Sequence, residues 1–204
     1  MGWIKLINHY RRDGPINKFL RRVGPCVRPH TSMTNQYPKR KIIRLKLYDY
    51  SSAGYYFVTI CTRHKESFFG EIINEAMSLN DAGKMIASVW EESPKRFDGV
   101  SLDLFVVMPN HIHGIIVLKN GVDLSRVIQA FKSVSTNEYI NGVHKLGWNK
   151  FDHTLWQMSF YDHVIRNEMD LLRIREYILN NPLKWAMDEE NPERSDTRSD
   201  PTVK

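Results

Sequence analysis

Two histidines with one residue between them, His111 and His113, lie inside an otherwise apolar run from Val106 to Leu118. A run of this composition predicts a buried β-strand. Successive side chains on a strand point to opposite faces, so we expect both imidazoles on one face and Ile112 on the other. Two imidazoles side by side on a rigid strand form half of a metal site. In the alternative interpretation, the two histidines are only polar side chains whose hydrogen bonds are satisfied by water or by the backbone. Short motifs often match by chance, which keeps this alternative open.

A tyrosine and an asparagine stand four residues apart at the end of the last predicted helix, which runs from about Glu168 to Asn180 and is closed by Pro182. Tyr177 and Asn181 therefore share a helix face, one turn apart. In the alternative interpretation, Tyr177 packs over the core with its hydroxyl in water, and Asn181 only ends the helix before the proline.

Taken together, these side chains fit phosphoryl transfer. Two neutral imidazoles and an amide oxygen can hold a hard divalent cation, Mg²⁺ or Mn²⁺, and leave positions open for phosphate oxygens. The cation would polarise the phosphate and stabilise the charge that grows on its oxygens. Tyr177 would attack in line and form a covalent phosphotyrosine, which retains the bond energy so that a strand can be rejoined. Tyr161 is a rival nucleophile, but no amide side chain follows it at the fourth residue.

The pattern of apolar residues predicts elements in the order β, α, β, β, α, β, α. They are a strand at 54–62, a helix from Asp81 to about Phe97 capped by Asn80, a strand at 100–107, the histidine strand ending at Asn120-Gly121, a helix at 124–139, an extended stretch at 155–165 and a helix at 168–180. Residues 68–72 are predicted as a short strand or turn. This order favours an α+β, ferredoxin-like fold, in which helices cover one face of an antiparallel sheet.

Length and composition exclude several classes of protein. The chain has 204 residues, 42% of them hydrophobic, which suits one domain of about 150 residues plus tails. No run approaches the roughly 18 apolar residues of a membrane span, and no signal-peptide core is present, so we expect a cytoplasmic protein with no membrane partner. Cys26 and Cys61 lie in unrelated contexts, which favours neither a disulfide framework nor a thiolate zinc site.

The net charge of +6 is concentrated near the N-terminus, where residues 1–48 hold twelve Lys or Arg against one acid. A basic arm suits a polyanionic partner, and a disordered, solubilising tail is the alternative. We divide the chain into a basic, flexible extension at 1–38, a folded domain at 39–186 and an acidic, disordered tail at 187–204. The shift in composition near Met33 also allows the protein to begin there.

Several stretches together resemble the HUH single-tyrosine transposases, and most closely the REP-associated tyrosine transposase branch of the IS200-like transposase family. They span about residues 40–185 in the family's order: Arg44-Leu45 with Tyr48-Asp49-Tyr50, Gly54 to Cys61, Met108 to Gly114, Phe131-Lys132-Ser133, Trp156-Gln157 with Phe160 to His163 and Ile165-Arg166, and Tyr177-Ile178 with Asn180-Asn181-Pro182. The resemblance implies the HUH fold, a ferredoxin-like sheet with the histidines on a central strand. It also implies metal-dependent nicking and rejoining of single-stranded DNA through a 5′-phosphotyrosine.

The resemblance implies a role for each matching residue. His111 and His113 match the metal ligands, and Tyr177 matches the nucleophile. Asn181 falls where related transposases place a polar third ligand, often Gln, and it is one methylene shorter. The implied partner is single-stranded or hairpin DNA of the nucleoid, and the implied active form is a monomer or a homodimer.

Basic and aromatic side chains can serve such a DNA. Candidate phosphate contacts are Arg40, Lys41, Arg44, Lys46, Lys132 and Arg166. Trp156, Phe160 or Tyr55 can stack on unpaired bases, although aromatic side chains also build cores. Two further arginines lie near Tyr177 in the sequence, Arg173 and Arg175. They either guide the DNA strand to the tyrosine or are simply solvated.

Two other functions are considered. A histidine-triad nucleotide hydrolase needs a third histidine where this chain has Ile115, so its nucleophile is missing. The alternative outside enzymology is a domesticated protein that binds single-stranded or hairpin DNA without cutting it. The sequence argues against this non-catalytic alternative only because it retains every catalytic residue type.

Overall fold

The structure is a computed structural model and describes residues 49–119, 121–188 and 190–192. Its main sheet has four strands in the order β4-β5-β1-β6, and every neighbouring pair is antiparallel. The strands are β1 (Gly54–Cys61), β4 (Val100–Met108), β5 (His111–Leu118) and β6 (Tyr161–Ile165). This order, with a helical connection after the first and third of these strands, is the ferredoxin-like topology, which confirms the predicted fold class.

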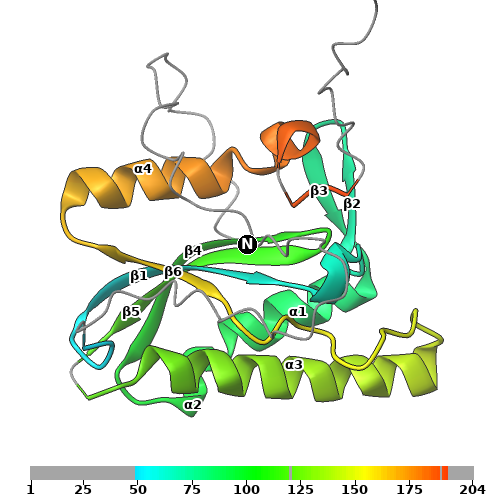
Figure 1. The fold of residues 1–204 in the computed structure, drawn as a ribbon, viewed down its shortest axis with the longest axis horizontal. Coiled ribbons are helices and arrows are strands. Elements are labelled where there is room, and N and C mark those ends of the chain that lie inside the picture. The colour runs from blue at the N-terminus through cyan, green and yellow to red at the C-terminus, as the bar shows by residue number, and fades with distance from the viewer. Residues whose placement is uncertain (1–48, 120, 189, 193–204) are drawn as a thin grey trace, which may run out of the picture. The chain divides into compact units, whose positions relative to one another are not determined.

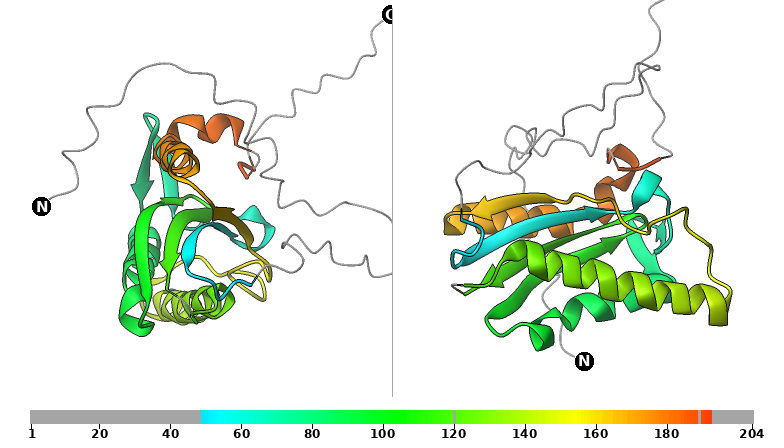
Figure 2. Two further views of the ribbon diagram at one scale, coloured as in Figure 1. Left: turned by 90° about the vertical axis from the view of Figure 1, so that its left-hand side faces the viewer. Right: turned by 60° about the horizontal axis from the view of Figure 1, so that its bottom comes forward.

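Helices cover both faces of the sheet. α1 (Asp81–Glu91) and α3 (Leu124–Leu146) lie on one face, and α4 (Glu168–Leu179) lies on the other (Figure 1). The further views show the same three layers (Figure 2). The sequence led us to expect helices on one face; α4 adds a second, smaller layer, because Ile174 and Ile178 bury an apolar stripe against Phe57 and Ile115 of the sheet.

The alternation of side chains along the central strands separates two cores. Val58 of β1 and Ile112 and Ile116 of β5 belong to the large core beneath α1 and α3. Phe57 and Ile115, one residue out of step, belong to the small core beneath α4. His111 and His113 share the parity of Ile115, so the same alternation places both imidazoles on the α4 face.

The helix boundaries follow local signals. Asn80 caps α1 by accepting a hydrogen bond from the Gly83 amide, as predicted. The expected helix at 81–97 is two helices, α1 and the short α2 (Ser93–Arg96), because Pro94 in the first turn of α2 cannot continue an α-helical hydrogen-bond ladder. α3 extends to Leu146, beyond the predicted end near Tyr139, and stops at Gly147, whose φ of 72° is left-handed.

The remaining elements are short. A hairpin of β2 (Gly70–Ile73) and β3 (Ala76–Leu79) turns through Asn74 and Glu75, both of which have positive φ. Two 3₁₀ helices lie at Arg63–Lys65 (η3) and Pro182–Met187 (η4). Of the predicted extended stretch at 155–165, only its last five residues form a strand.

The predicted extension at 1–38 and the basic cluster of Arg40, Lys41, Arg44 and Lys46 lie outside the described residues. The described part of the predicted acidic tail includes Glu190, whose side chain is buried. No described helix combines the length and apolarity that a membrane crossing demands.

Candidate metal centre and nucleophile

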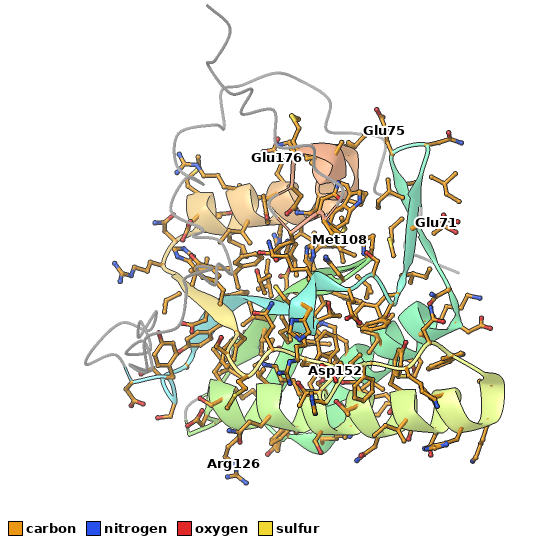
Figure 3. All side chains as sticks on the ribbon, turned by 45° about the vertical axis from the view of Figure 1, so that its right-hand side comes forward. Glu71, Glu75, Met108, Arg126, Asp152 and Glu176 are labelled. Atoms are coloured by element: carbon orange, nitrogen blue, oxygen red, sulfur yellow. The ribbon has the colours of Figure 1, made fainter. Side chains whose placement is uncertain are left out.

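The two histidines meet at one end of the central strand pair. His111 and His113 begin β5, opposite Cys61 and Thr59 of β1 and opposite Met108 and Val106 of β4. Met108, labelled in Figure 3, marks the end of β4 at which the site lies. Both imidazoles are almost wholly buried, and their Nε2 atoms lie 3.0 Å apart. The predicted pairing of the histidines on one face is confirmed.

Asn110 holds the ring of His111 in a defined tautomer. Its Nδ2 donates to the carbonyl oxygens of Lys65 at 2.9 Å and Glu190 at 2.6 Å, which fixes the orientation of the amide. Its Oδ1 therefore accepts from Nδ1 of His111, at 2.8 Å. With the proton on Nδ1, the lone pair of His111 is on Nε2, the atom that faces His113.

Thr59 holds the second ring from the neighbouring strand. Its hydroxyl lies 2.8 Å from Nδ1 of His113. A hydroxyl can accept from an Nδ1–H group, which leaves Nε2 of His113 unprotonated when that atom binds a cation. Thus each imidazole is held at Nδ1, and each presents Nε2 to the same point.

Burial keeps both imidazoles neutral. It lowers the pKa of His113 to about 3. The pKa of His111 is lowered well below its ordinary value, first by burial and then by electrostatic interactions with His113 and Lys65. A neutral imidazole is the form that binds a metal, so ligands of this kind need lose no proton at neutral pH.

Tyr177 projects from α4 onto this pair. Its hydroxyl lies 3.3 Å from Nε2 of His113, and its ring packs edge-on against Phe57. Glu176, labelled in Figure 3, lies on the exposed side of the same helix. The pKa of Tyr177 is raised, first by burial and then by the charge of Asp188, while a side-chain hydrogen bond with Asn181 lowers it. The phenol is therefore protonated at neutral pH.

Asn181 lies just beyond α4, at the start of η4, and its side chain reaches the phenol of Tyr177. The residue is 2% exposed, and its buried Oδ1 has no hydrogen-bond partner. An unsatisfied buried carbonyl oxygen is costly and is a suitable ligand for a hard cation. The structure brings Tyr177 and Asn181 together as the four-residue spacing predicted.

Asp188 is a further candidate ligand that the sequence did not reveal. Each of three residues, Asp188, His111 and His113, offers one ligand atom, and these three atoms lie within 4.8 Å of one another. Asp188 follows η4, which carries Trp185 against the ring of His111 at a centroid separation of 5.9 Å. The only local signal was an acidic run, which we assigned to a disordered tail.

These donor atoms fit a divalent cation. Two adjacent ligands of an octahedral cation at about 2.1 Å are about 3.0 Å apart. That is the separation of the two Nε2 atoms. A carboxylate oxygen of Asp188 and the unpaired Oδ1 of Asn181 are of the oxygen type that hard cations prefer as ligands. The described residues therefore include a possible His-His-Asp metal site, with an amide oxygen close by.

Several other predicted candidates have structural partners. Arg175 forms an ion pair with Asp103, at 2.6 Å. Trp156 is 4% exposed and donates to Ser135, so it belongs to the core. Tyr161 contacts Phe57 with its ring edge.

The two described candidates for phosphate contacts differ in setting. The ammonium of Lys132 donates to the carbonyl oxygens of Gln157 at 2.8 Å and Ser159 at 3.0 Å. It also lies 5.7 Å from the ring centroid of Phe160. Arg166 is exposed at the end of β6.

An antiparallel ferredoxin-like sheet that carries a His-x-His pair on a central strand, beside a tyrosine on a helix, is the arrangement that the HUH resemblance implied. The chain belongs to the IS200-like transposase family: the family model described as "Transposase IS200 like" matches residues 50–181. This membership gives the protein a transposase-like role on DNA.

Relatives are known at several distances. An uncharacterized protein of Haemophilus influenzae is 41% identical over 167 residues, which cover 74% of this chain and 92% of that protein. A second protein of that species, described as "Putative REP-associated tyrosine transposase", is 27% identical over 141 residues, covering 67% of this chain and 74% of its own. A structure of a REP-associated tyrosine transposase bound to a REP hairpin matches with a TM-score of 0.49 and 23% identity, over 76% of this chain and 74% of that one.

Proposed function

We propose that this protein nicks and rejoins single-stranded or hairpin DNA through a covalent 5′-phosphotyrosine at Tyr177, with a divalent cation, Mg²⁺ or Mn²⁺, in the site. The supporting observation is the Tyr177 hydroxyl, which lies 3.3 Å from Nε2 of a buried His113. Nε2 of His111 lies 3.0 Å from that same nitrogen. A nucleophile next to two metal-binding nitrogens is the arrangement that metal-assisted phosphoryl transfer requires.

His111 and His113 would hold the cation through Nε2. Asp188 and Asn181 would each contribute an oxygen. A bound divalent cation would polarise the phosphate and offset the negative charge of its oxygens. His111, His113 and Asn181 are neutral ligands. Their neutrality favours DNA binding, because each carboxylate in the site, such as that of Asp188, repels an incoming phosphodiester.

The chemical step forms one bond and breaks one. The phenol oxygen of Tyr177 bonds to phosphorus and gives its proton to solvent. The bond from phosphorus to the 3′ oxygen breaks, and that oxygen takes up a proton and leaves as a 3′-hydroxyl. The 5′ phosphate remains on Tyr177 as a diester, and attack by another 3′-hydroxyl reverses the step and joins two strands. The packing of the phenol ring against Phe57 would hold it for in-line attack.

The DNA would bind by its phosphates and by its unpaired bases. We assign phosphate contacts to Arg166, to Lys132 and to the N-terminal cluster of Arg40, Lys41, Arg44 and Lys46. An ammonium that already holds two carbonyl groups keeps its net charge, so Lys132 can still attract a phosphate. Tyr55, exposed on β1, is a candidate for base stacking.

The relative described as a REP-associated tyrosine transposase favours that branch of the family for this chain. We accordingly propose residues 39–186 as the HUH domain, hairpins of repeated DNA in the nucleoid as the substrate, the cytoplasm as the location, and a monomer or homodimer as the active form.

A labelled single strand carrying a repeat-derived hairpin, incubated with the purified protein and Mn²⁺, tests the proposal. We expect a covalent protein–DNA adduct on a denaturing gel, and phosphorylated Tyr177 in its tryptic peptides. Tyr177→Phe should abolish the adduct, whereas Tyr161→Phe, a matched change on the same face of the sheet, should retain it. His111→Ala combined with His113→Ala should abolish cleavage and spare much of the DNA affinity, because affinity depends mainly on backbone charge.

The outcomes separate the enzyme from the alternative. DNA binding without an adduct on any repeat-derived strand would establish the non-catalytic binder. An adduct that persists in Tyr177→Phe would show that a different residue is the nucleophile.

A further inference from the structure

The helix that carries Tyr177 is held on the sheet by a small apolar core. Ile174 and Ile178 are buried against Phe57 and Ile115, and Leu171 packs beside them. Apolar contacts of this kind are non-directional, so they hold a helix on a sheet more strongly than they fix its rotation. A phenol that must meet one nitrogen atom needs a directional contact as well.

Such a contact joins α4 to the edge strand β4. Nε of Arg175 donates to Oδ1 of Asp103 at 2.9 Å, and Nη2 donates to Oδ2 at 2.6 Å. Parallel hydrogen bonds from a guanidinium to both oxygens of one carboxylate are strong and fix the orientation of both groups. Asp103 also accepts from the Leu104 amide at 2.7 Å. The pKa of Asp103 is lowered, chiefly by its hydrogen bond with Arg175.

A β-bulge in β4 lies beside Asp103. The register of β4 against β5 shifts between Leu102 and Phe105. Leu102 and Phe105 both pack against the large core, although two residues rather than one separate them. Leu104 and Val106 pack against the small core beneath α4. Asp103 and Leu104 therefore both face α4: alternation from Leu102 gives Asp103 this face, and the bulge gives the next residue the same face before alternation resumes at Phe105.

Rotation of α4 about its axis would move Arg175 and Tyr177 in opposite senses relative to the sheet, one toward it and the other away from it. At about 100° per residue, Arg175 and Tyr177 flank the apolar stripe of Ile174 and Ile178 on opposite sides. Arg175 reaches the edge strand β4, and Tyr177 reaches Phe57 and His113 on the central strands. Rotation of α4 about its axis therefore cannot loosen the ion pair without moving the phenol relative to His113.

We propose that Asp103 and Arg175 are positioning residues, which set the rotation of α4 so that the Tyr177 hydroxyl meets the histidine pair. This inference rests on the proposed function of Tyr177.

A double-mutant cycle in the full chain tests the inference. The variants are Asp103→Asn, Arg175→Gln and both together, and the measurements are the rate of adduct formation at saturating hairpin DNA with Mn²⁺, the Kd for that DNA, and the thermal unfolding midpoint. Because a misplacement of about 1 Å can lower a rate by about 100-fold, we expect each single change to slow adduct formation by about 10- to 100-fold. The double variant should be no slower than either single variant, and the Kd should stay within about twofold.

Two further variants complete the test. Arg96→Gln removes an ion pair distant from the site, between Arg96 of α2 and Glu92, the N-cap of that helix, and should leave the rate unchanged. Arg175→Lys keeps the charge but loses the two-point contact, so it should recover only part of the rate, and it replaces Arg175→Gln if that variant fails to fold.

Three results would overturn the inference: single variants that react at the wild-type rate, single effects that multiply in the double variant, or a loss of DNA affinity that accounts for the slower reaction. The last would assign Arg175 to DNA binding. Failure of the wild-type protein to form an adduct would instead count against the proposed function of Tyr177.

Discussion

Removal of the Thr59 hydroxyl should weaken cation binding while leaving the fold in place. Thr59→Val keeps the shape of the side chain and deletes the atom that lies 2.8 Å from Nδ1 of His113. The imidazole is 2% exposed, so no water can replace the lost partner. A buried polar group left unpaired costs about 1–3 kcal/mol of stability. Loss of a hydrogen bond behind a metal ligand lowers metal affinity by about 10- to 100-fold.

Thr62→Val provides the matched control. Thr62 is also buried, and its hydroxyl donates to the Glu66 carbonyl oxygen at 2.9 Å, in a loop beside the site. Both variants should lose similar stability in urea unfolding, but only Thr59→Val should lose affinity for Mn²⁺ in a calorimetric titration of the DNA-free protein. Equal Mn²⁺ affinity in Thr59→Val and the wild type would refute the assignment of Nε2 of His113 as a ligand oriented from Nδ1. An equal loss in Thr62→Val would show that general loosening is the cause.

Three further predictions concern the histidine strand. Gly114→Ala should destabilise the protein by about 1–3 kcal/mol in urea unfolding, because a Cβ there would lie 2.5 Å from Cζ2 of the buried Trp90; an unchanged midpoint would contradict this close packing. The pKa of His113 is about 3 in the folded protein and 6.5 ordinarily, so the unfolded chain binds more protons between these values. The metal-free protein should therefore lose stability as the pH falls from 6.5 towards 3, and His113→Gln should reduce this loss when midpoints at pH 7.5 and 5.0 are compared. Because the phenol and the histidine pair meet within one chain, a mixture of Tyr177→Phe with a variant carrying both His111→Ala and His113→Ala should form no adduct, and restored activity would show exchange of α4 between chains.

Sequence periodicity was sufficient for the parts of the site that lie within single elements. The alternation of a strand put His111 and His113 on one face, and the spacing of a helix put Tyr177 next to Asn181. Both inferences needed only the local geometry of regular backbone. Asn181 lies one residue past the helix cap, yet its backbone is still helical, so the spacing holds.

The parts that sequence reasoning missed depend on contacts between distant segments. Asp188 reaches the histidines only because η4 directs the chain back over the site, and no local pattern predicts such a path. Thr59 and Asn110 support the imidazoles from another strand and from a turn. Asp103 meets Arg175 although 72 residues separate them in the sequence, and a bulge beside Asp103 breaks the alternation on which sequence interpretation relies.

The order of the elements along the chain has a consequence during synthesis. The histidine strand, β1 and the Asn110 turn are made before α4, and 64 residues separate His113 from Tyr177. At about 5–20 residues per second, a nascent chain carries the histidine pair for roughly 3–13 s before its tyrosine is made. A chain abandoned in that interval lacks the phenol altogether. Under the proposed chemistry, a copy that ends before Tyr177 can fold the histidine pair but cannot form the phosphotyrosine.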